Sequence, residues 1–313
     1  LDDIGATTPV AARRVRAYNH SMTRQAELIK DARTTLGEGA FWDERAGILD
    51  WIDIEGREVR VYDPSTDADE VYAMADRPGT VVPRKPGGLV IAMGRGVVLV
   101  DEPGQVPRTL CTFEEEADDS RMNDGKCDPA GRLWVGSLNM GGAKQTSRLY
   151  CVEADGSYRV ALTGVTISNG IVWTSDEKTM YYIDTPTRQI QAFDYDRASG
   201  AVSNGRVAFT VPDGMGHPDG MTIDANDTLW VAMFGGSAVR HFDPADGSLL
   251  DTVELPASNV TSCALGGDEL RDLYITTARA GLDEQRREAQ PAAGGLFRAR
   301  VDVPGVPQHR FAG

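Results

Sequence analysis

The stretch Asn123-Asp-Gly-Lys-Cys-Asp-Pro-Ala-Gly-Arg-Leu-Trp-Val-Gly136 combines a polar residue, a short strand, a tight turn and a second strand. Similar stretches begin at Asn169, Asp219 and Ser262, and an earlier copy opens at Glu38. Consecutive copies from Asn123 onward lie roughly 40 to 50 residues apart, and the 85 residues between Glu38 and Asn123 hold two such periods. Repeats of this length, built from short strands, are typical of a β-propeller.

A second signature has the same period and places a hydrophobic residue and an acid before a turn. Its copies are Tyr62-Asp63-Pro64, Val152-Glu153, Tyr195-Asp196 and Phe242-Asp243-Pro244. The two signatures together predict an all-β fold, a six-bladed β-propeller with four antiparallel strands in each blade.

The repeats also predict the domain boundaries. Residues 25–313 form a single propeller, and residues 1–24 form a flexible N-terminal extension. We expect residues 25–33 to add a strand to the last blade, which residues 262–301 begin, because closure by both termini removes exposed sheet edges. Residues 280–293 are rich in Gln, Arg and Glu and are predicted to form a long surface loop.

Composition limits the classes of partner. A formal net charge of −15 disfavours nucleic acid and anionic membranes, since both would be repelled. No run of 18 apolar residues occurs, so we expect no membrane segment and a cytoplasmic location. We also expect a monomer or weak homo-oligomer. The four cysteines show no metal-binding or dithiol spacing and are expected to be buried free thiols.

The first polar residue of each repeat is a candidate site residue. In a propeller the innermost strands line a central channel, so equivalent positions of different blades face one another. Four of these positions are Glu38, Asn123, Asn169 and Asp219, which all offer oxygen donors. Hard divalent cations take such ligands, whereas zinc usually recruits His or Cys.

Two other interpretations compete with a metal site. Asn-Asp-Gly, Asn-Gly and Asp-Gly are also hairpin-turn sequences, although four copies in register argue against four independent turns. A nucleophilic triad is not indicated, because Gly-x-Ser-x-Gly is absent and the four histidines are scattered. His217 lies near the predicted channel through Asp219 but is typical of a loop histidine.

Several motifs resemble those of the regucalcin/gluconolactonase family of six-bladed propellers, over about residues 28–313. They include Gly37-Glu38-Gly39, Arg121-Met-Asn123-Asp-Gly-Lys, Ile167-Ser-Asn169-Gly, Pro218-Asp219-Gly-Met221 and Ala293-Gly-Gly-Leu-Phe297. The resemblance implies metal-dependent hydrolysis of a sugar-acid lactone to the free aldonic acid.

By the same resemblance, Glu38, Asn169 and Asp219 are metal ligands, and Arg121 and Asn123 hold the substrate. Ca²⁺ is the favoured ion, with Zn²⁺, Mn²⁺ and Mg²⁺ as alternatives. The family's substrate-binding glutamate has no obvious counterpart in Gly136-Ser-Leu-Asn139, so the preferred sugar stays open.

The candidate residues also indicate lactone hydrolysis by their chemistry alone. A dication between two carboxylates polarises a lactone carbonyl and stabilises the oxyanion that forms on attack. Asp219 is the candidate to accept the water's proton, although a carboxylate beside a cation is a weak base and ion-bound water can carry part of the activation. Two rival functions are a non-catalytic calcium-binding propeller and a promiscuous ester or organophosphate hydrolase.

Overall fold

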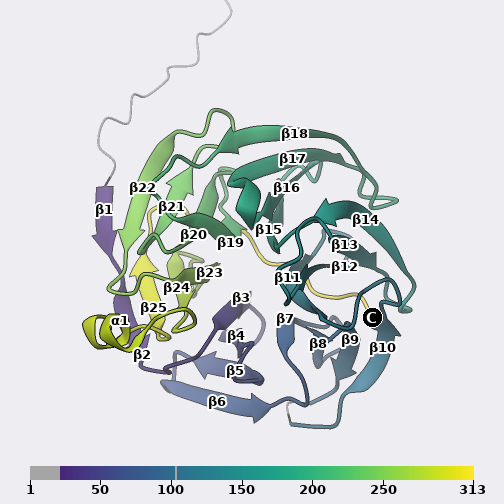
Figure 1. Cartoon of the computed structure of the whole chain (residues 1–313), viewed down its shortest axis with the longest axis horizontal. Helices are drawn as coiled ribbons and strands as arrows, with labels where there is room; N and C mark the ends of the chain where they lie inside the picture. Colours follow the sequence, from purple (N-terminus) through teal and green to yellow (C-terminus); the bar gives the residue numbers. More distant parts are fainter. Residues whose placement is uncertain (1–21, 103) are drawn as a thin grey trace, which may run out of the picture.

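The computed structural model describes residues 22–102 and 104–313. Its strands form six sheets in a ring, and the innermost strand of each sheet lies nearest the central axis of the ring, here called the channel (Figure 1). This arrangement confirms the predicted six-bladed β-propeller.

The first three blades each consist of four consecutive strands. Blade one contains β3 (Gly37–Asp43), β4 (Ile48–Asp53), β5 (Glu58–Asp63) and β6 (Ala68–Ala73). Blade two contains β7 (Pro78–Pro83), β8 (Leu89–Met93), β9 (Gly96–Val100) and β10 (Arg108–Thr112). Blade three contains β11 (Ser120–Cys127), β12 (Leu133–Asn139), β13 (Ser147–Val152) and β14 (Tyr158–Val165).

Blades four to six follow the same order from the channel outward. Blade four contains β15 (Ser168–Trp173), β16 (Thr179–Asp184), β17 (Gln189–Tyr195) and β18 (Val202–Thr210), with the short 3₁₀ helix η1 (Thr185–Thr187) after β16. Blade five contains β19 (His217–Ile223), β20 (Leu229–Phe234), β21 (Ala238–Phe242) and β22 (Leu249–Glu254). Blade six contains β23 (Val260–Gly266), β24 (Asp272–Thr277) and β25 (Leu296–Arg300).

The N-terminal strands complete the ring. Strand β2 (Glu27–Lys30) pairs antiparallel with β25, as predicted for residues 25–33. Strand β1 (Met22–Gln25) pairs in parallel with the outer strand β22 of blade five, so pairing begins three residues before the predicted domain start at residue 25. Residues 1–21 of the expected N-terminal extension lie outside the described residues.

The segment 280–293 is not entirely a loop. It contains the helix α1 (Glu284–Ala289), whose N-cap residue Asp283 accepts a hydrogen bond from the backbone N–H of Arg286 at 2.8 Å. The prediction of an irregular loop was therefore wrong for these six residues. A helix this short has too few turns to produce a readable hydrophobic period.

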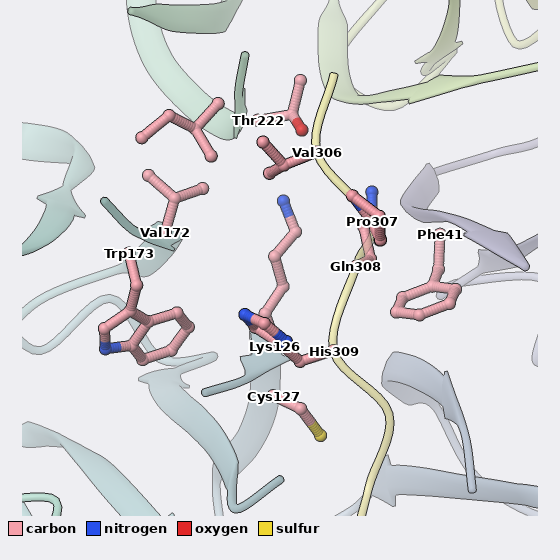
Figure 2. Close-up of a pocket in the computed structure, with 11 residues that line it drawn as sticks. Phe41, Lys126, Cys127, Val172, Trp173, Thr222, Val306, Pro307, Gln308 and His309 are labelled. Carbon is pink, nitrogen blue, oxygen red and sulfur yellow. The ribbon is translucent and has the colours of Figure 1, made fainter. Parts of the chain in front are cut away.

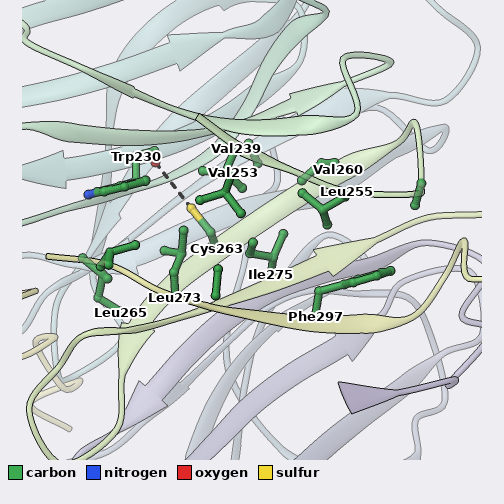
Figure 3. Close-up of a cluster of buried hydrophobic side chains, with 14 of the residues drawn as sticks. Trp230, Val239, Val253, Leu255, Val260, Cys263, Leu265, Leu273, Ile275 and Phe297 are labelled. Carbon is green, nitrogen blue, oxygen red and sulfur yellow. Dashed lines mark hydrogen bonds between the residues drawn. The ribbon is translucent and has the colours of Figure 1, made fainter. Parts of the chain in front are cut away.

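The core lies between neighbouring blades. In β12, Leu133 and Val135 pack into the cluster shared with blade two, whereas Trp134 packs against blade four. This division follows from strand geometry, because successive side chains point to opposite faces of a sheet. Figure 3 shows the equivalent interface of blades five and six, where Cys263 Sγ lies 3.4 Å from the backbone oxygen of Trp230. All four cysteines are buried and free, as predicted.

The C-terminal segment returns across one end of the channel. It forms isolated bridges with two blades, Gly305 with Asp224 and Phe311 with Arg84. The Phe311 side chain is fully buried among residues of blades one, two and three. The segment therefore covers that end of the ring from blade five to blade two. The described part of the chain contains no helix long and apolar enough to cross a bilayer.

Candidate functional site at the channel

The predicted site residues lie at irregularities of the inner strands. The pairing of β11 with β12 skips the two residues after Met122, and the pairing of β15 skips the two after Ser168. Strand β19 skips the two residues after Pro218, and β3 skips the two after Glu38. In all four cases the strand continues and pairs again with the same neighbour, so the Asn-Asp-Gly, Asn-Gly and Asp-Gly sequences form β-bulges rather than hairpin turns. Bulges turn side chains away from the regular alternation, which places polar groups in the channel.

Arg121, Asn123 and Asn169 form one hydrogen-bonded group. Arg121 Nη1 donates to Asn123 Oδ1 at 2.7 Å. Asn123 Nδ2 donates to Asn169 Oδ1 at 2.9 Å and to the backbone oxygen of Ser168 at 2.7 Å. All three side chains are buried, so the residues predicted to bind substrate contact a predicted metal ligand directly.

Thr185 extends this group to blade five, and no sequence motif indicated its role. It is the first residue of η1, and its Oγ1 accepts a hydrogen bond from Asn169 Nδ2 at 2.7 Å. The same hydroxyl donates to the backbone oxygen of Pro218 at 2.8 Å, next to Asp219. Thr185 thereby fixes the orientation of the Asn169 amide and directs its oxygen toward Asn123.

Glu38 and Asp219 are buried carboxylates that influence each other. Burial, followed by the charge of Asp124, raises the pKa of Glu38 to about 8, against a smaller opposing effect of Arg121. Burial, then the charges of Glu38 and Asp124, hold the pKa of Asp219 well above its usual range. Carboxylates in this situation lack sufficient positive charge nearby, and a bound cation would supply it.

Asp124 is a third acid near this site, and it was not among the residues predicted from the repeat. It is buried, follows Asn123 directly, and lies close enough to Glu38 and Asp219 to raise the pKa of both. A regular strand would point Asp124 and Asn123 to opposite faces, but both fall in the residues skipped by the β11 pairing. The available signal was the acid inside Asn123-Asp124-Gly125 itself.

The donor set fits a hard cation. Among the residues that the structure describes, no three His, Cys, Asp or Glu side chains form a ready metal cluster. The predicted ligands are instead two carboxylates, Glu38 and Asp219, and the amide oxygen of Asn169. An oxygen-only set suits Ca²⁺, Mg²⁺ or Mn²⁺ better than zinc, and two carboxylates neutralise one dication.

The other candidate side chains do not join this group. His217, at the start of β19, is exposed. His241 is buried, contacts Asp224 and Thr228, and stacks on Trp230 with ring centroids 4.0 Å apart. Asn139 donates to Asp119 at 2.8 Å at the end of β12, which is a surface interaction. Neither His217 nor His241 is therefore placed to act as a base in this group.

We expect the stability of the metal-free protein to fall as the pH rises from about 5 to 8. The pKa of Glu38 is about 8 in the folded chain, against an ordinary 4.5. The folded state therefore holds this proton more tightly, and the resulting stabilisation is complete below the ordinary pKa and lost as the pH approaches 8. Thermal unfolding in chelator should show a Tm lower at pH 8 by on the order of 5 °C. Glu38→Gln should flatten this dependence, and an undiminished drop in that variant would contradict the assignment.

Comparisons with known proteins agree with the fold. Residues 36–279 match the profile of the SMP-30/Gluconolactonase/LRE-like region. A Bacillus subtilis (strain 168) protein, YvrE, whose name describes it as a putative sugar lactone lactonase, is 39% identical over 92% of this chain and 99% of its own. Xenopus laevis regucalcin is 36% identical over 89% of this chain and 95% of its own.

A solved structure extends the comparison. The calcium-binding protein regucalcin from Agrobacterium tumefaciens superposes with a TM-score of 0.87 and 25% identity, over 92% of this chain and 98% of that one. The profile covers most of the described chain, and the two relatives above exceed 30% identity over nearly all of it. The chain therefore belongs to the SMP-30/gluconolactonase/LRE-like family.

Proposed function

We propose that the protein is a divalent-metal-dependent lactonase that hydrolyses a sugar-acid lactone to the free aldonic acid. One observation carries the proposal: two buried carboxylates, Glu38 and Asp219, lie close enough to each other and to Arg121 for their charges to interact, and Arg121 belongs to a buried hydrogen-bonded group with Asn123 and Asn169. The sugar lactonase name of the B. subtilis relative supports the same reaction class.

Each residue has a distinct task in this proposal. Glu38, Asn169 and Asp219 hold the ion, with Ca²⁺ favoured by the oxygen donors. When bound, the ion supplies a Lewis acid that polarises the lactone carbonyl. Arg121 orients the substrate through planar guanidinium donors that suit hydroxyl and ring oxygens. Asn123 uses both of its amide N–H donors on Ser168 and Asn169, so it offers a substrate hydroxyl the remaining lone pair of Oδ1. The hydrogen bond at 2.7 Å from Arg121 to that oxygen holds the two side chains in one arrangement before the substrate arrives.

The protons balance through Asp219. Its carboxylate accepts one proton as a water molecule attacks the lactone carbonyl carbon. When the tetrahedral intermediate collapses, the bond from the carbonyl carbon to the ring oxygen breaks. The ring oxygen leaves as a hydroxyl after it takes a proton from Asp219. The product is one open-chain hydroxy acid, and Asp219 returns to its starting state.

Metal removal tests the reaction. With a panel of aldonolactones and acid release as the readout, chelator should reduce the rate by at least about 100-fold, because the carbonyl loses its electrophilic partner. Added Ca²⁺ or Mn²⁺ should restore it. The Ca²⁺ titration should be followed by calorimetry in the same samples. Full activity in excess chelator would refute metal dependence.

A second candidate is a calcium-binding propeller without catalysis, which the name of the Agrobacterium protein favours. The same samples separate the two functions. Ca²⁺ binding without acid release from any lactone of the panel would support the second candidate. An ester or organophosphate hydrolase would instead show its highest kcat/KM on substrates outside the panel.

A further inference from the structure

Lys126 lies on the channel side of β11, between the candidate site and the end covered by the C-terminal segment. It follows Asn123 by three residues, and its Nζ donates to the backbone oxygen of Met221, two residues after Asp219. One side chain thus connects the strand that carries Asn123 with the strand that carries Asp219. In Figure 2 the ammonium points toward Val306 and Thr222.

The ammonium of Lys126 lies in a partly buried, largely apolar place. The cavity around it measures about 40 Å³, which is room for a few water molecules. Its walls are largely apolar, and residues 306–309 of the C-terminal segment cover it. In the ranges 22–102 and 104–313 the ammonium has no carboxylate within ion-pair distance. A charge in such a place acts over a longer range than one in bulk water.

The charge of Lys126 reaches the candidate site through Asp124. Burial lowers the pKa of Lys126, and the charge of Asp124 opposes that effect. Burial also raises the pKa of Asp124, and Lys126 is the largest influence in the other direction. Asp124 in turn acts on both Glu38 and Asp219. Three acids and one dication would leave the site net negative without Lys126 and Arg121.

We propose that Lys126 is a positioning residue: a fixed positive charge below the site that balances Asp124, weakens the hold on the divalent ion and preserves the ion's power to polarise the substrate. This inference rests on the metal-dependent lactonase proposed above. Removal of the charge should leave the ion in more negative surroundings. The ion should then bind more tightly and polarise the carbonyl less.

The test compares three substitutions in the full chain. Lys126→Met removes the charge and the hydrogen bond, Lys126→Gln removes the charge but keeps a donor, and Lys126→Arg keeps the charge. For Met and Gln, calorimetry should show the Ca²⁺ Kd falling by about 5- to 10-fold, and kcat at saturating Ca²⁺ should fall by a similar factor. Arg should stay within about 2-fold of the native Kd. Lys178→Met, at an exposed lysine far along the chain, is the matched control and should change neither quantity.

The diagnostic result is a lower Ca²⁺ Kd together with a lower kcat in the same variant. If Lys126 served packing alone, the variants would loosen the ion and lower the Tm together. If Lys126→Gln kept the native Kd while Lys126→Met did not, the hydrogen bond to Met221 and not the charge would be responsible. Either result overturns the proposal.

A second route covers variants that fail to fold. Val306→Asp places a carboxylate from the C-terminal segment beside the ammonium and neutralises it without altering a blade. Its Ca²⁺ Kd should also fall by several-fold, and an unchanged or higher Kd would overturn the proposal. A native chain that binds no divalent ion would refute the metal site itself, whereas native binding with unaltered variants would refute the role of Lys126 alone.

Discussion

Asp219→Asn is expected to lower kcat for lactone hydrolysis by on the order of 10³-fold, within the range that general acid–base catalysis contributes. The amide has the same shape and keeps one oxygen for the ion, but it cannot accept the proton of the attacking water. Turnover should therefore fall much further than Ca²⁺ affinity. Kinetics at saturating Ca²⁺, with occupancy measured by calorimetry, separate the two effects.

His217→Ala provides the control for this prediction, because His217 lies on the same strand two residues away and is exposed. It should retain most of the activity. An inactive His217→Ala together with an active Asp219→Asn would show that the wrong base is assigned. A histidine-based hydrolase would then replace the present proposal.

Phe311→Ala should cost about 3–5 kcal/mol of the free energy of unfolding, which is the usual loss for a large aromatic side chain removed from a core. Phe311 is fully buried in a cluster that includes Phe41, Val82 and Met122. These three residues come from the inner strands of blades one, two and three. Its backbone N–H donates to Pro83 at 3.0 Å, so the altered segment stays attached while its side-chain packing is lost. Denaturant unfolding measures the change.

Ala312→Ser is the matched substitution on the same segment, since Ala312 is exposed and only its backbone N–H, which donates to Gly131, holds it in place. It should change the free energy of unfolding by less than about 0.5 kcal/mol. If Phe311→Ala lost no more free energy of unfolding than this control, a packing role for Phe311 would be contradicted. The segment would then be held by its backbone bridges alone.

The repeat of short strands was sufficient to predict the propeller, its six blades and the closure by β2. The reason is that each blade packs against a neighbour on both of its faces, so the second strand of a blade is hydrophobic at consecutive positions. Leu133-Trp134-Val135 in blade three and Leu229-Trp230-Val231 in blade five are examples. Strand β1 escaped prediction because its parallel pairing with β22 adds a fifth strand outside the repeat. An outer strand such as β1 joins its neighbour through backbone hydrogen bonds, and these bonds require no particular side chains that a sequence would reveal.

The candidate site was only partly accessible from sequence. Position within the repeat predicted that Asn123 and Asn169 meet, and they share a hydrogen bond. Asp219 follows Pro218, whose backbone oxygen accepts from Thr185, the hydrogen-bond partner of Asn169. Asp124 was missed because the strand alternation assigns it to the other face, and only the bulge overrides that rule. Thr185 was missed because it follows β16 rather than opening an inner strand. The ion and the substrate assignments stay predictions until metal and lactone are tested.

Strand β2 has a consequence for synthesis of the chain. It leaves the ribosome among the earliest described elements, but its partner β25 follows only after Leu296. The nascent chain therefore carries an unpaired strand through the production of five blades. Ring closure must be the final event, and a partial chain would present two open sheet edges to its neighbours and to chaperones.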